Sequence, residues 1–392
     1  MKRILALVII SACLLCSFTP VFANYAPKTR AEALISNDAE LDLDVKSAVL
    51  MEATTGTVLY AKNSVEALSP ASVTKIMTLL IVAEALDAKK ISLEESVKIS
   101  PAAASMGGSQ VFLEEGEEMT VEELLKCTVI ASANDAAVAL AELICGSESA
   151  FVSRMNERAA ELGMKNTYFE NATGLDESTE RHLTSAEDIA IMSRELIRHE
   201  CVTKYSSVWQ DSIRDGEFIL TNTNRLVRYY SGCTGLKTGS TDKAGFCVSA
   251  TAKRGDMELI AVVMGSPTRE ARNDAARILL DFGFANYSLY NDPAGAVEKV
   301  PVYSGIYDET VVYSSGFSTV CKKGEEKRIE KSYVIPQELK APVSAGERVG
   351  EIIYSLDGEE LGRASITVSE DIPKIGVAEL FSRIVSRILI GR

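Results

Sequence analysis

The sequence has very little histidine: His182 and His199 are the only two in 392 residues. Histidine is the usual general base beside a nucleophilic serine. Because there are only two histidines, and His199 follows Arg198 at the end of a predicted helix, few residues are available for a Ser-His-Asp triad. Cys13 and Cys16 lie in the predicted signal peptide, and the other six cysteines form no CxxC pair and have no histidine at ligand spacing, which argues against zinc. We therefore predict no metal and no cofactor, and any catalytic base must be another residue type.

Positive charge is also scarce. Lysine and arginine total 41 against 55 aspartates and glutamates, and the net charge of −14 argues against a nucleic-acid-binding surface. The composition, with 46% hydrophobic and 24% charged residues, is that of a globular protein. A chain of this length has room for two or three domains.

The first 23 residues are typical of a signal peptide, because a basic start at residues 1–3 precedes an apolar run over residues 4–18 and a small residue at Ala23. We expect an exported chain that starts near Asn24. An uncleaved membrane anchor is one alternative. A lipoprotein processing site at Cys13 is another, although it comes soon after the basic residues.

Six cysteines remain after the predicted signal peptide, and most are expected to be buried as small apolar residues. Export permits disulfides. Cys233 with Cys247 is the first pair to test, although the sequence does not settle the connectivity.

Residues 24–290 predict an α/β (α+β) domain. β-branched and apolar runs at 47–53 and 57–61 flank a glycine-bearing turn and predict a hairpin, and strands are predicted at 244–252 and 258–264. A capping box at Thr120 opens a helix that ends near Ala131, and further helices are predicted at 135–144, 151–162, 184–196 and 269–282. The mixed order of these elements favours an antiparallel sheet covered by helices.

The remainder of the chain differs in character. Short strands at 297–302, 310–313, 319–321, 351–355 and 363–368 predict a small β-sandwich or barrel over residues 291–372. Residues 373–392 then predict an amphipathic helix, with apolar residues on one face and Arg383 and Arg387 on the other. Such a basic helix fits an in-plane anchor on the surface of an anionic membrane, and the alternative is a helix packed on the protein's own surface.

Three short motifs occur in order: Ser72-Val73-Thr74-Lys75, Ser132-Ala133-Asn134 and Lys237-Thr238-Gly239. Residues three apart share a helical face, so Lys75 can lie beside the Ser72 hydroxyl, although a helix cap followed by a solvated charge would show the same spacing. The ordered set is the signature of penicillin-binding proteins and serine β-lactamases. Burial and the nearby Lys237 are expected to keep Lys75 neutral and therefore basic.

The motifs lead to a mechanistic hypothesis in which Ser72 attacks a peptide carbonyl and Lys75 takes its proton. The oxyanion is held by the backbone N–H groups of Ser72 and Ser240. Ser132 relays a proton to the leaving amine. Asn134 is assigned to the backbone amide of the substrate, and Lys237 and Thr238 are assigned to its terminal carboxylate. Gly239 is a further substrate-binding residue of the third motif.

The chain resembles the D-alanyl-D-alanine carboxypeptidases, which are low-molecular-mass penicillin-binding proteins. Beyond the three motifs, the likeness includes residues 107–113, 171–175 and 241–245, the β-domain and the terminal helix. The resemblance implies removal of the terminal D-alanine from peptidoglycan pentapeptide stems at the outer face of the cytoplasmic membrane, and acylation by β-lactams.

Two positions outside the three motifs bear on how far the resemblance extends. Ser240 stands where well-known members of the family carry histidine, which puts the rate and the substrate preference in doubt. Arg269 lies where the family has an arginine-bearing loop near the carboxylate site, and its alternative is a solvated charge at a helix N-terminus. A serine β-lactamase, an endopeptidase or transpeptidase, and a β-lactam or cell-wall binding protein without turnover are the competing functions.

Overall fold

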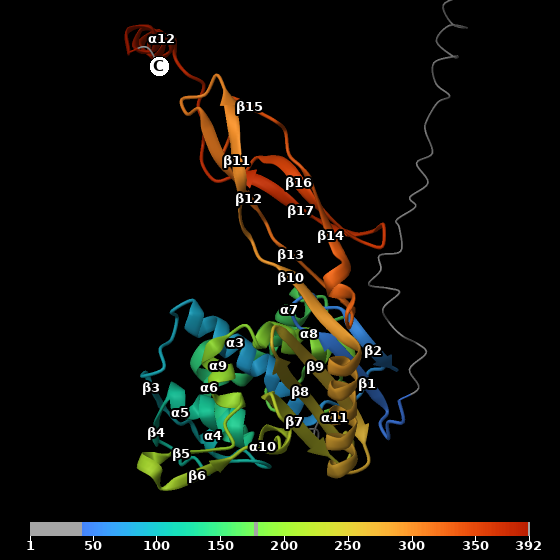
Figure 1. Cartoon of the computed structure of the whole chain (residues 1–392). Coiled ribbons are helices and arrows are strands. Elements are labelled where there is room, and N and C mark those ends of the chain that lie inside the picture. Colours follow the sequence, from blue (N-terminus) through green and yellow to red (C-terminus); the bar gives the residue numbers. More distant parts are fainter. Residues whose placement is uncertain (1–40, 176–178, 391–392) are drawn as a thin grey trace, which may run out of the picture.

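The computed structural model describes residues 41–175 and 179–390 (Figure 1). The predicted signal peptide and the start near Asn24 lie outside the described residues. Figure 1 shows a large body of helices around a sheet, from which a narrow body of strands extends to a terminal helix.

The large body is organised around an antiparallel sheet of five strands in the order β2-β1-β9-β8-β7. The first hairpin joins the last strand, since Ser47 lies opposite Met264 and Glu52 opposite Leu259. The helices between β2 and β7 are therefore an insert, and the predicted antiparallel sheet of mixed order is confirmed. The strands are β1 (Ser47–Glu52), β2 (Val58–Lys62), β7 (Cys233–Thr241), β8 (Gly245–Arg254) and β9 (Met257–Ser266).

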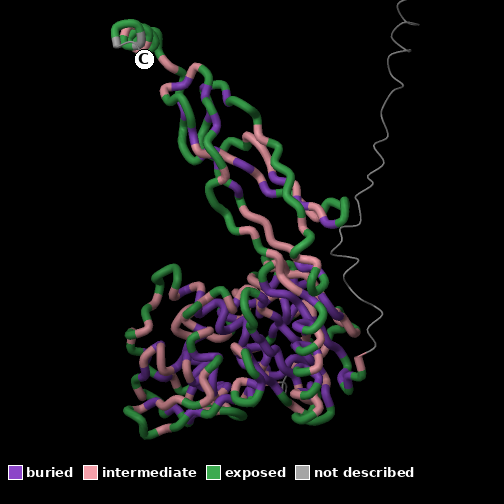
Figure 2. Tube along the Cα trace, in the orientation of Figure 1, coloured by how far each residue is buried: buried purple, intermediate pink, exposed green. Residues whose placement is uncertain are grey.

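The sheet is covered on both faces, so its strands are apolar on both sides. Val49 of β1 belongs to the core shared with α3 (Lys75–Asp87) and α8 (Ala186–Leu196), whereas Leu50 belongs to the core under α11 (Arg269–Asn286). This alternation follows from the two-residue period of a strand. The result is two cores, one on each face of the sheet. Figure 2 shows that buried residues are concentrated inside the large body.

The remaining helical insert follows the predicted pattern. The capping box is confirmed, because Thr120 Oγ1 accepts from the Glu123 N–H at 3.2 Å and the Glu123 carboxylate accepts from the Thr120 N–H at 3.0 Å. The insert comprises α4 (Pro101–Ala104), α5 (Val121–Lys126) with a π-helical turn at Cys127–Ala131, α6 (Asn134–Cys145), α7 (Glu148–Glu161), α9 (Glu200–Ser206), α10 (Leu226–Tyr229) and the small hairpins β3 (Ser96–Lys98) with β4 (Glu118–Thr120) and β5 (Gln210–Ile213) with β6 (Phe218–Thr221).

Helix α11 runs past its predicted end at Phe282. Its Gly283 lies against the sheet, where an added Cβ would be 2.5 Å from a methyl carbon of Leu259 and 2.9 Å from one of Leu50. The glycine therefore allows a close approach of helix and sheet and does not stop the helix.

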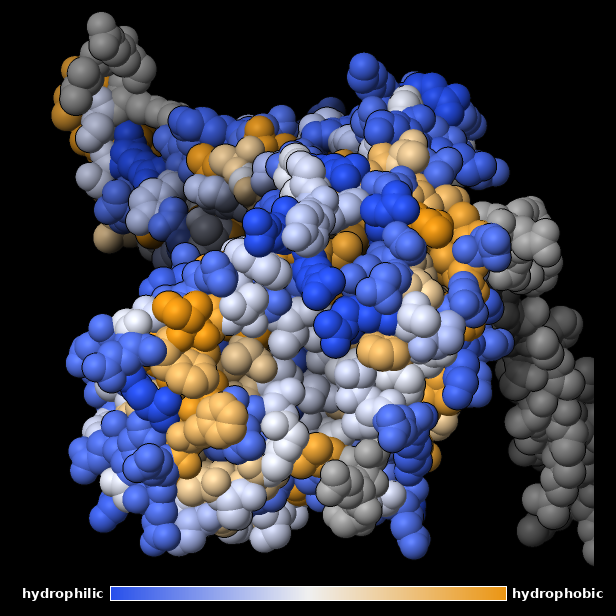
Figure 3. Space-filling model, turned by 90° about the horizontal axis from the view of Figure 1, so that it is seen from below, coloured by the Kyte–Doolittle hydropathy of each residue, from blue (hydrophilic) through white to orange (hydrophobic). Residues whose placement is uncertain are grey.

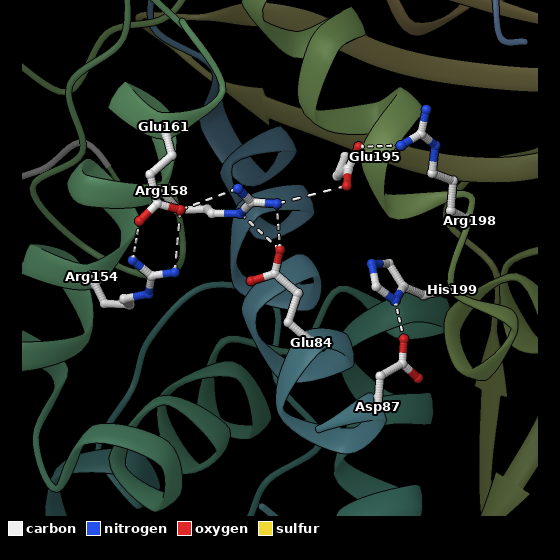
Figure 4. A network of polar contacts seen from close by, with 8 residues as sticks. All are labelled: Glu84, Asp87, Arg154, Arg158, Glu161, Glu195, Arg198 and His199. Atoms are coloured by element: carbon white, nitrogen blue, oxygen red, sulfur yellow. Dashed lines mark hydrogen bonds and ion pairs between the residues drawn. The ribbon is translucent and has the colours of Figure 1, made fainter. Parts of the chain in front are cut away.

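Helix α3 is buried along almost its whole length, and polar contacts fix its far end (Figure 4). Arg158 of α7 forms ion pairs with Glu84 of α3 at 2.7 Å and with Glu195 of α8 at 3.7 Å. His199 Nδ1 lies 2.6 Å from a carboxylate oxygen of Asp87, so this histidine is at the opposite end of α3 from Lys75. Each such pair contributes little alone, but together they join three helices.

The narrow body begins where α11 ends. It contains a six-stranded sheet in the order β14-β16-β17-β12-β11-β15 and a separate pair of β10 with β13, around a core that includes Val312, Tyr354 and Ile366. The predicted all-β fold is confirmed, with three additional strands, β10, β14 and β15. The strands are β10 (Tyr287–Asp292), β11 (Gly295–Tyr303), β12 (Glu309–Ser314), β13 (Phe317–Lys322), β14 (Ile329–Val334), β15 (Leu339–Lys340), β16 (Arg348–Leu356) and β17 (Glu359–Val368).

Helix α12 (Val377–Ile390) lies at the far end of the narrow body, away from the sheet of the large body (Figure 1). The opposite end of the molecule, seen in Figure 3, has hydrophobic side chains gathered on one part and hydrophilic ones over much of the rest. Among residues 41–175 and 179–390, no single helix is long and apolar enough to cross a bilayer, and α6 with α7 reaches that criterion only as a pair bent by 83°.

The disulfide considered between Cys233 and Cys247 is wrong. In the β7–β8 ladder Cys233 lies opposite Ala252, and Cys247 lies opposite Gly239, so the two cysteines occupy different ends of the ladder. All six cysteines of the described chain are free thiols.

Candidate active site

The first motif places a serine and a lysine in direct contact. Ser72 lies in a 3₁₀ turn at Ala71–Thr74, and Lys75 is the first residue of α3. In a 3₁₀ turn side chains three residues apart are eclipsed. The Lys75 amine accordingly lies 3.0 Å from Ser72 Oγ, and it also donates to the carbonyl of Thr173 at 2.8 Å.

Burial makes this lysine unusual. Lys75 is fully buried, whereas Ser72 is only partly buried and lines a cleft. Burial holds the pKa of the Lys75 amine well below its ordinary value; the charge of Lys237 lowers it further, and Asp135 acts in the opposite direction. An amine whose pKa is lowered in this way gives up its proton more easily, and in its neutral form it can accept a proton from the hydroxyl beside it.

The segment 171–175 packs against the turn that carries Ser72. Gly174 has φ of +84°, and an added Cβ there would lie 1.8 Å from the Ala71 carbonyl oxygen, so only glycine fits against the turn that carries Ser72. The Asn171 side chain accepts from the Gly174 N–H at 2.7 Å and shapes the loop. The loop thereby directs the Thr173 carbonyl at Lys75.

The second motif sits where the π-helical turn after α5 meets α6. Ser132 adopts a left-handed conformation with φ of +64°, which ends the turn and places its hydroxyl 2.7 Å from the Lys237 amine. Asn134 donates through Nδ2 to the Gly107 carbonyl at 2.7 Å. Its Oδ1 is buried without a hydrogen-bond partner among the described residues. An unpaired buried acceptor costs about 1–3 kcal/mol, so this oxygen is available to a ligand N–H.

The third motif lies within β7, the edge strand of the sheet. Lys237 points inward, donates to Ser132 and is almost fully buried. Burial lowers the pKa of Lys237 to about 7, and the guanidinium of Arg272 adds to this effect. Thr238 donates through its hydroxyl to Thr223 at 2.8 Å, which ties the strand to the opposite wall of the cleft.

Gly239 brings β7 against the serine turn. A Cβ on this residue would lie 2.7 Å from the Ser72 backbone nitrogen and 2.9 Å from the Pro70 carbonyl oxygen. We expect Gly239→Ala to push the strand away from the turn, to lower the free energy of unfolding by about 1–3 kcal/mol and to slow acylation by penicillin by about tenfold or more.

Thermal unfolding and the rate of adduct formation check this prediction. Gly295→Ala is the matched control, since an added Cβ there meets nothing within 4 Å. If Gly239→Ala reacted and unfolded like Gly295→Ala, the close approach would not matter.

The cleft itself has a volume of about 520 Å³ and runs from Ser72 and Ser132 along β7. Arg269 lines it, as the resemblance implied, together with Ser240. The sequence did not point to Arg272 or Arg225, which also line it. Arg272 is three residues after Arg269 on α11 and shares its helical face, which is the signal that was available.

The site can therefore activate a serine with a buried amine of lowered pKa and hold an anion beside it. No carboxylate is among the described residues that line the cleft. A serine hydroxyl, a lysine base and a cationic pocket at a sheet edge are the parts needed for acyl transfer from a substrate that ends in a carboxylate.

This fold and site define a serine peptidase of the penicillin-binding class. The chain belongs to the D-alanyl-D-alanine carboxypeptidase family, whose sequence pattern matches residues 33–268. Residues 290–374 match the C-terminal domain of penicillin-binding protein 5. The predicted family is confirmed.

Individual relatives agree with this assignment. The chain is 44% identical to the D-alanyl-D-alanine carboxypeptidase DacF of Bacillus subtilis over 98% of both chains, and 32% identical to DacC of Escherichia coli over 85% of this chain and 86% of that one. The structure of penicillin binding protein 5 from Haemophilus influenzae has a TM-score of 0.74 and 30% identity, and it covers 85% of this chain and 99% of its own. The likeness thus extends through both bodies.

Proposed function

We propose that this protein removes the terminal D-alanine from peptidoglycan stem peptides through an acyl-enzyme on Ser72. The observation that carries the proposal is the buried amine of Lys75, 3.0 Å from the Ser72 hydroxyl. Lys75 takes the hydroxyl proton as Ser72 attacks the carbonyl of the penultimate residue. The C–N bond then breaks, the amine leaves with a proton, and water hydrolyses the ester.

Ser132 is suited to deliver that proton. Its oxygen accepts from the Lys237 amine, so its own O–H is free to point at the leaving nitrogen. A water molecule or the substrate itself then passes the proton between Lys75 and the Ser132 hydroxyl. Ser132 and Lys75 thus share the proton transfers of acylation and deacylation.

The edge of β7 supplies the binding surface for an extended peptide. Half of the backbone groups of an edge strand have no strand partner, so a substrate can add beside it. The N–H of Ser240 on this strand and that of Ser72 form the oxyanion site, and the unpaired Oδ1 of Asn134 accepts from a substrate N–H. The terminal carboxylate is bound by Lys237, Thr238 and Arg269.

A β-lactam fits the same site, because it presents a reactive carbonyl and a carboxylate at a similar spacing. The 31% identical penicillin-binding protein D2 of Listeria monocytogenes, with a TM-score of 0.58, has been solved in ampicillin-bound and cefotaxime-bound forms. We therefore propose that β-lactams acylate Ser72. The cleft lacks a carboxylate among its described residues, which favours a slow deacylation over the turnover of a β-lactamase.

The test measures two reactions of the same preparation. Release of D-alanine from a pentapeptide stem, with only stoichiometric reaction of a chromogenic cephalosporin, supports the carboxypeptidase. Continuous cephalosporin turnover without D-alanine release would support the β-lactamase, and stoichiometric acylation without D-alanine release would support a binding protein.

The terminal helix α12 supports attachment to a membrane. Its apolar residues are largely exposed, including Phe381 at 67% and Ile388 at 75%. On its other face Arg383 pairs with Asp308 at 2.8 Å, so the polar side faces the β-domain and the apolar side faces away. We propose that residues 373–392 lie in the outer surface of the cytoplasmic membrane and that the β-domain, residues 291–372, holds the peptidase domain, residues 24–290, above it.

Deleting residues 376–392 should remove binding to vesicles of anionic phospholipid while release of D-alanine from a soluble peptide stays within twofold, because the active site is at the other end of the molecule. Sedimentation with vesicles measures the first effect. Vesicle binding that survived the deletion would show that the helix is not the anchor.

A further inference from the structure

The cleft holds more positive charge than one carboxylate needs. Arg225, Arg269 and Arg272 line it beside Lys237, and none of the three arginines forms an ion pair with a carboxylate in the described chain. Arg272 is only 3% exposed, and its side chain bonds only to the neutral amide of Asn273, at 2.9 and 3.1 Å. Arg225 and Arg269 are exposed, but a buried guanidinium without a counter-ion is costly, so Arg272 favours an anionic ligand in the cleft.

The positions of these cations divide them into two groups. Lys237 and Thr238 are adjacent on β7 and Arg269 and Arg272 share a face of α11, so these residues suit the terminal carboxylate. Arg225 comes from a different wall. Its segment is fixed by the hydrogen bond of Thr238 to Thr223, which lies two residues before Arg225. Arg225 is near enough to Arg272 to lower the pKa of that guanidinium, which burial and Arg269 lower to about 10.

An aromatic wall lies next to Arg225. The guanidinium of Arg228 is 5.2 Å from the ring centroid of Trp209 and 5.6 Å from that of Tyr229, and both rings line the cleft. Stacking of this kind orders an exposed arginine and gives the wall a fixed shape. Arg225 and this wall form an extension of the cleft, because they come from elements other than β7 and α11, which carry the residues assigned to the terminal carboxylate.

A single D-alanine does not use this extension. Its carboxylate can accept from one guanidinium and one ammonium, and its methyl group is small. A leaving residue with a second carboxylate on its side chain would reach both groups of cations.

We infer that Arg225 and the Trp209–Tyr229 wall form a second anion subsite for a leaving D-amino acid that carries a side-chain carboxylate. This inference rests on the proposed function. A peptidoglycan cross-link to a stem that ends at a diaminodicarboxylic acid has this chemistry: the amine that leaves is on a carbon with one carboxylate, and the other carboxylate is free at the far end of the same residue. Ser72 attacks the D-alanyl carbonyl, the cross-link C–N bond breaks, and the amine takes a proton and leaves with one stem. Water then hydrolyses the ester on Ser72 and releases the other stem.

The experiment compares three peptides that differ only in the leaving residue, N-acyl-D-alanyl-D-alanine, -D-glutamate and -D-glutamine. Glutamate and glutamine have nearly the same shape, so their ratio of kcat/KM isolates the side-chain charge. We expect the mature protein to prefer D-glutamate over D-glutamine by about tenfold, as for one charge-assisted hydrogen bond. It should also cleave a cross-linked dimer of stem peptides.

Arg225→Gln should bring the glutamate-to-glutamine ratio to within about twofold of one and should slow cleavage of the dimer. Arg277→Gln is the matched control. It makes the same change at an exposed position on α11 that does not line the cleft, and the ratio should not move. The fluorescence of Trp209, the only tryptophan in the chain, confirms that each variant is folded.

Three results would overturn the inference: a ratio near one in the unmodified protein, a ratio that persists in Arg225→Gln, or no cleavage of the dimer. If D-alanine were still released in those cases, the proposed carboxypeptidase would stand and only the second subsite would fail. Failure to release any of the three leaving residues would instead remove the proposed function.

Discussion

Ser72→Ala should abolish D-alanine release, with a loss of about 10⁴-fold or more in kcat, and should form no covalent adduct with penicillin. The reason is that no other described hydroxyl in the cleft is paired with a basic amine in the same way: Ser132 accepts from Lys237, whose pKa of about 7 leaves it half protonated at neutral pH, whereas the pKa of Lys75 is held well below its ordinary value by burial. Mass spectrometry of the intact protein after exposure to penicillin measures the adduct.

Ser132→Ala distinguishes the two hydroxyls of the site. This variant keeps Ser72 and Lys75 in contact, so it should still form one adduct, more slowly, and that adduct should map to the peptide that contains Ser72. An adduct on Ser72→Ala, or an adduct that disappeared only in Ser132→Ala, would assign the nucleophile to Ser132.

Lys75→Arg should lower the rate of acylation by about 10²–10⁴-fold, the range for loss of a general base. Arginine is of similar length and can donate to Ser72 and to Thr173, but it does not lose its proton in a protein. Lys75→Met should lower the rate by a similar factor, because it removes the base altogether. Stopped-flow measurement of acylation gives both rates.

The pair of variants separates the two roles of a lysine. If Lys75 acted through its positive charge, Lys75→Arg would keep most of the activity and Lys75→Met would not. Lys253→Arg, at the exposed end of β8, is a control for the substitution itself and should react like the unmodified protein. A Lys75→Arg enzyme within tenfold of that control would contradict the assignment of the base.

Much of the site could be predicted because its residues are close in sequence. The contact of Ser72 with Lys75 depends only on two residues that are three apart in the sequence. The position of Ser132 between two helices could be predicted because a capping box, a first helix and a second helix follow one another along the chain. The 3₁₀ turn at Ala71–Thr74 was not foreseen, since the packing of Gly174 and Gly239 against it imposes its shape and both are distant in sequence.

Contacts between segments that are far apart in the chain could not be predicted from the sequence. The bond from Lys237 to Ser132 joins residues 105 apart, and the effect of Arg272 on Lys237 depends on how α11 packs on the sheet. The error at Cys233 has the same origin, because which residues face each other in a hairpin depends on its register. Local periodicity gives the elements, while the register and the packing come from the whole fold.

The strands that were missed have a physical reason as well. Along the edge strand β14 all residues after Ile329 are exposed, so its sequence has no alternation of apolar and polar residues to detect. Strand β15 has only two residues. Strand β10 begins directly at the end of α11, where the helical pattern conceals its start.

The central claim is that Lys75 is neutral when Ser72 reacts, and the pH dependence of acylation by benzylpenicillin tests it most directly. The rate at saturating penicillin should rise about tenfold per pH unit on the acid side and level off well below pH 10.5, because the pKa of Lys75 is lowered from that value. The second-order rate constant should then fall above about pH 7, where Lys237 loses the proton that attracts the carboxylate. A saturating rate that stayed flat on the acid side, or that rose only near pH 10.5, would contradict the account.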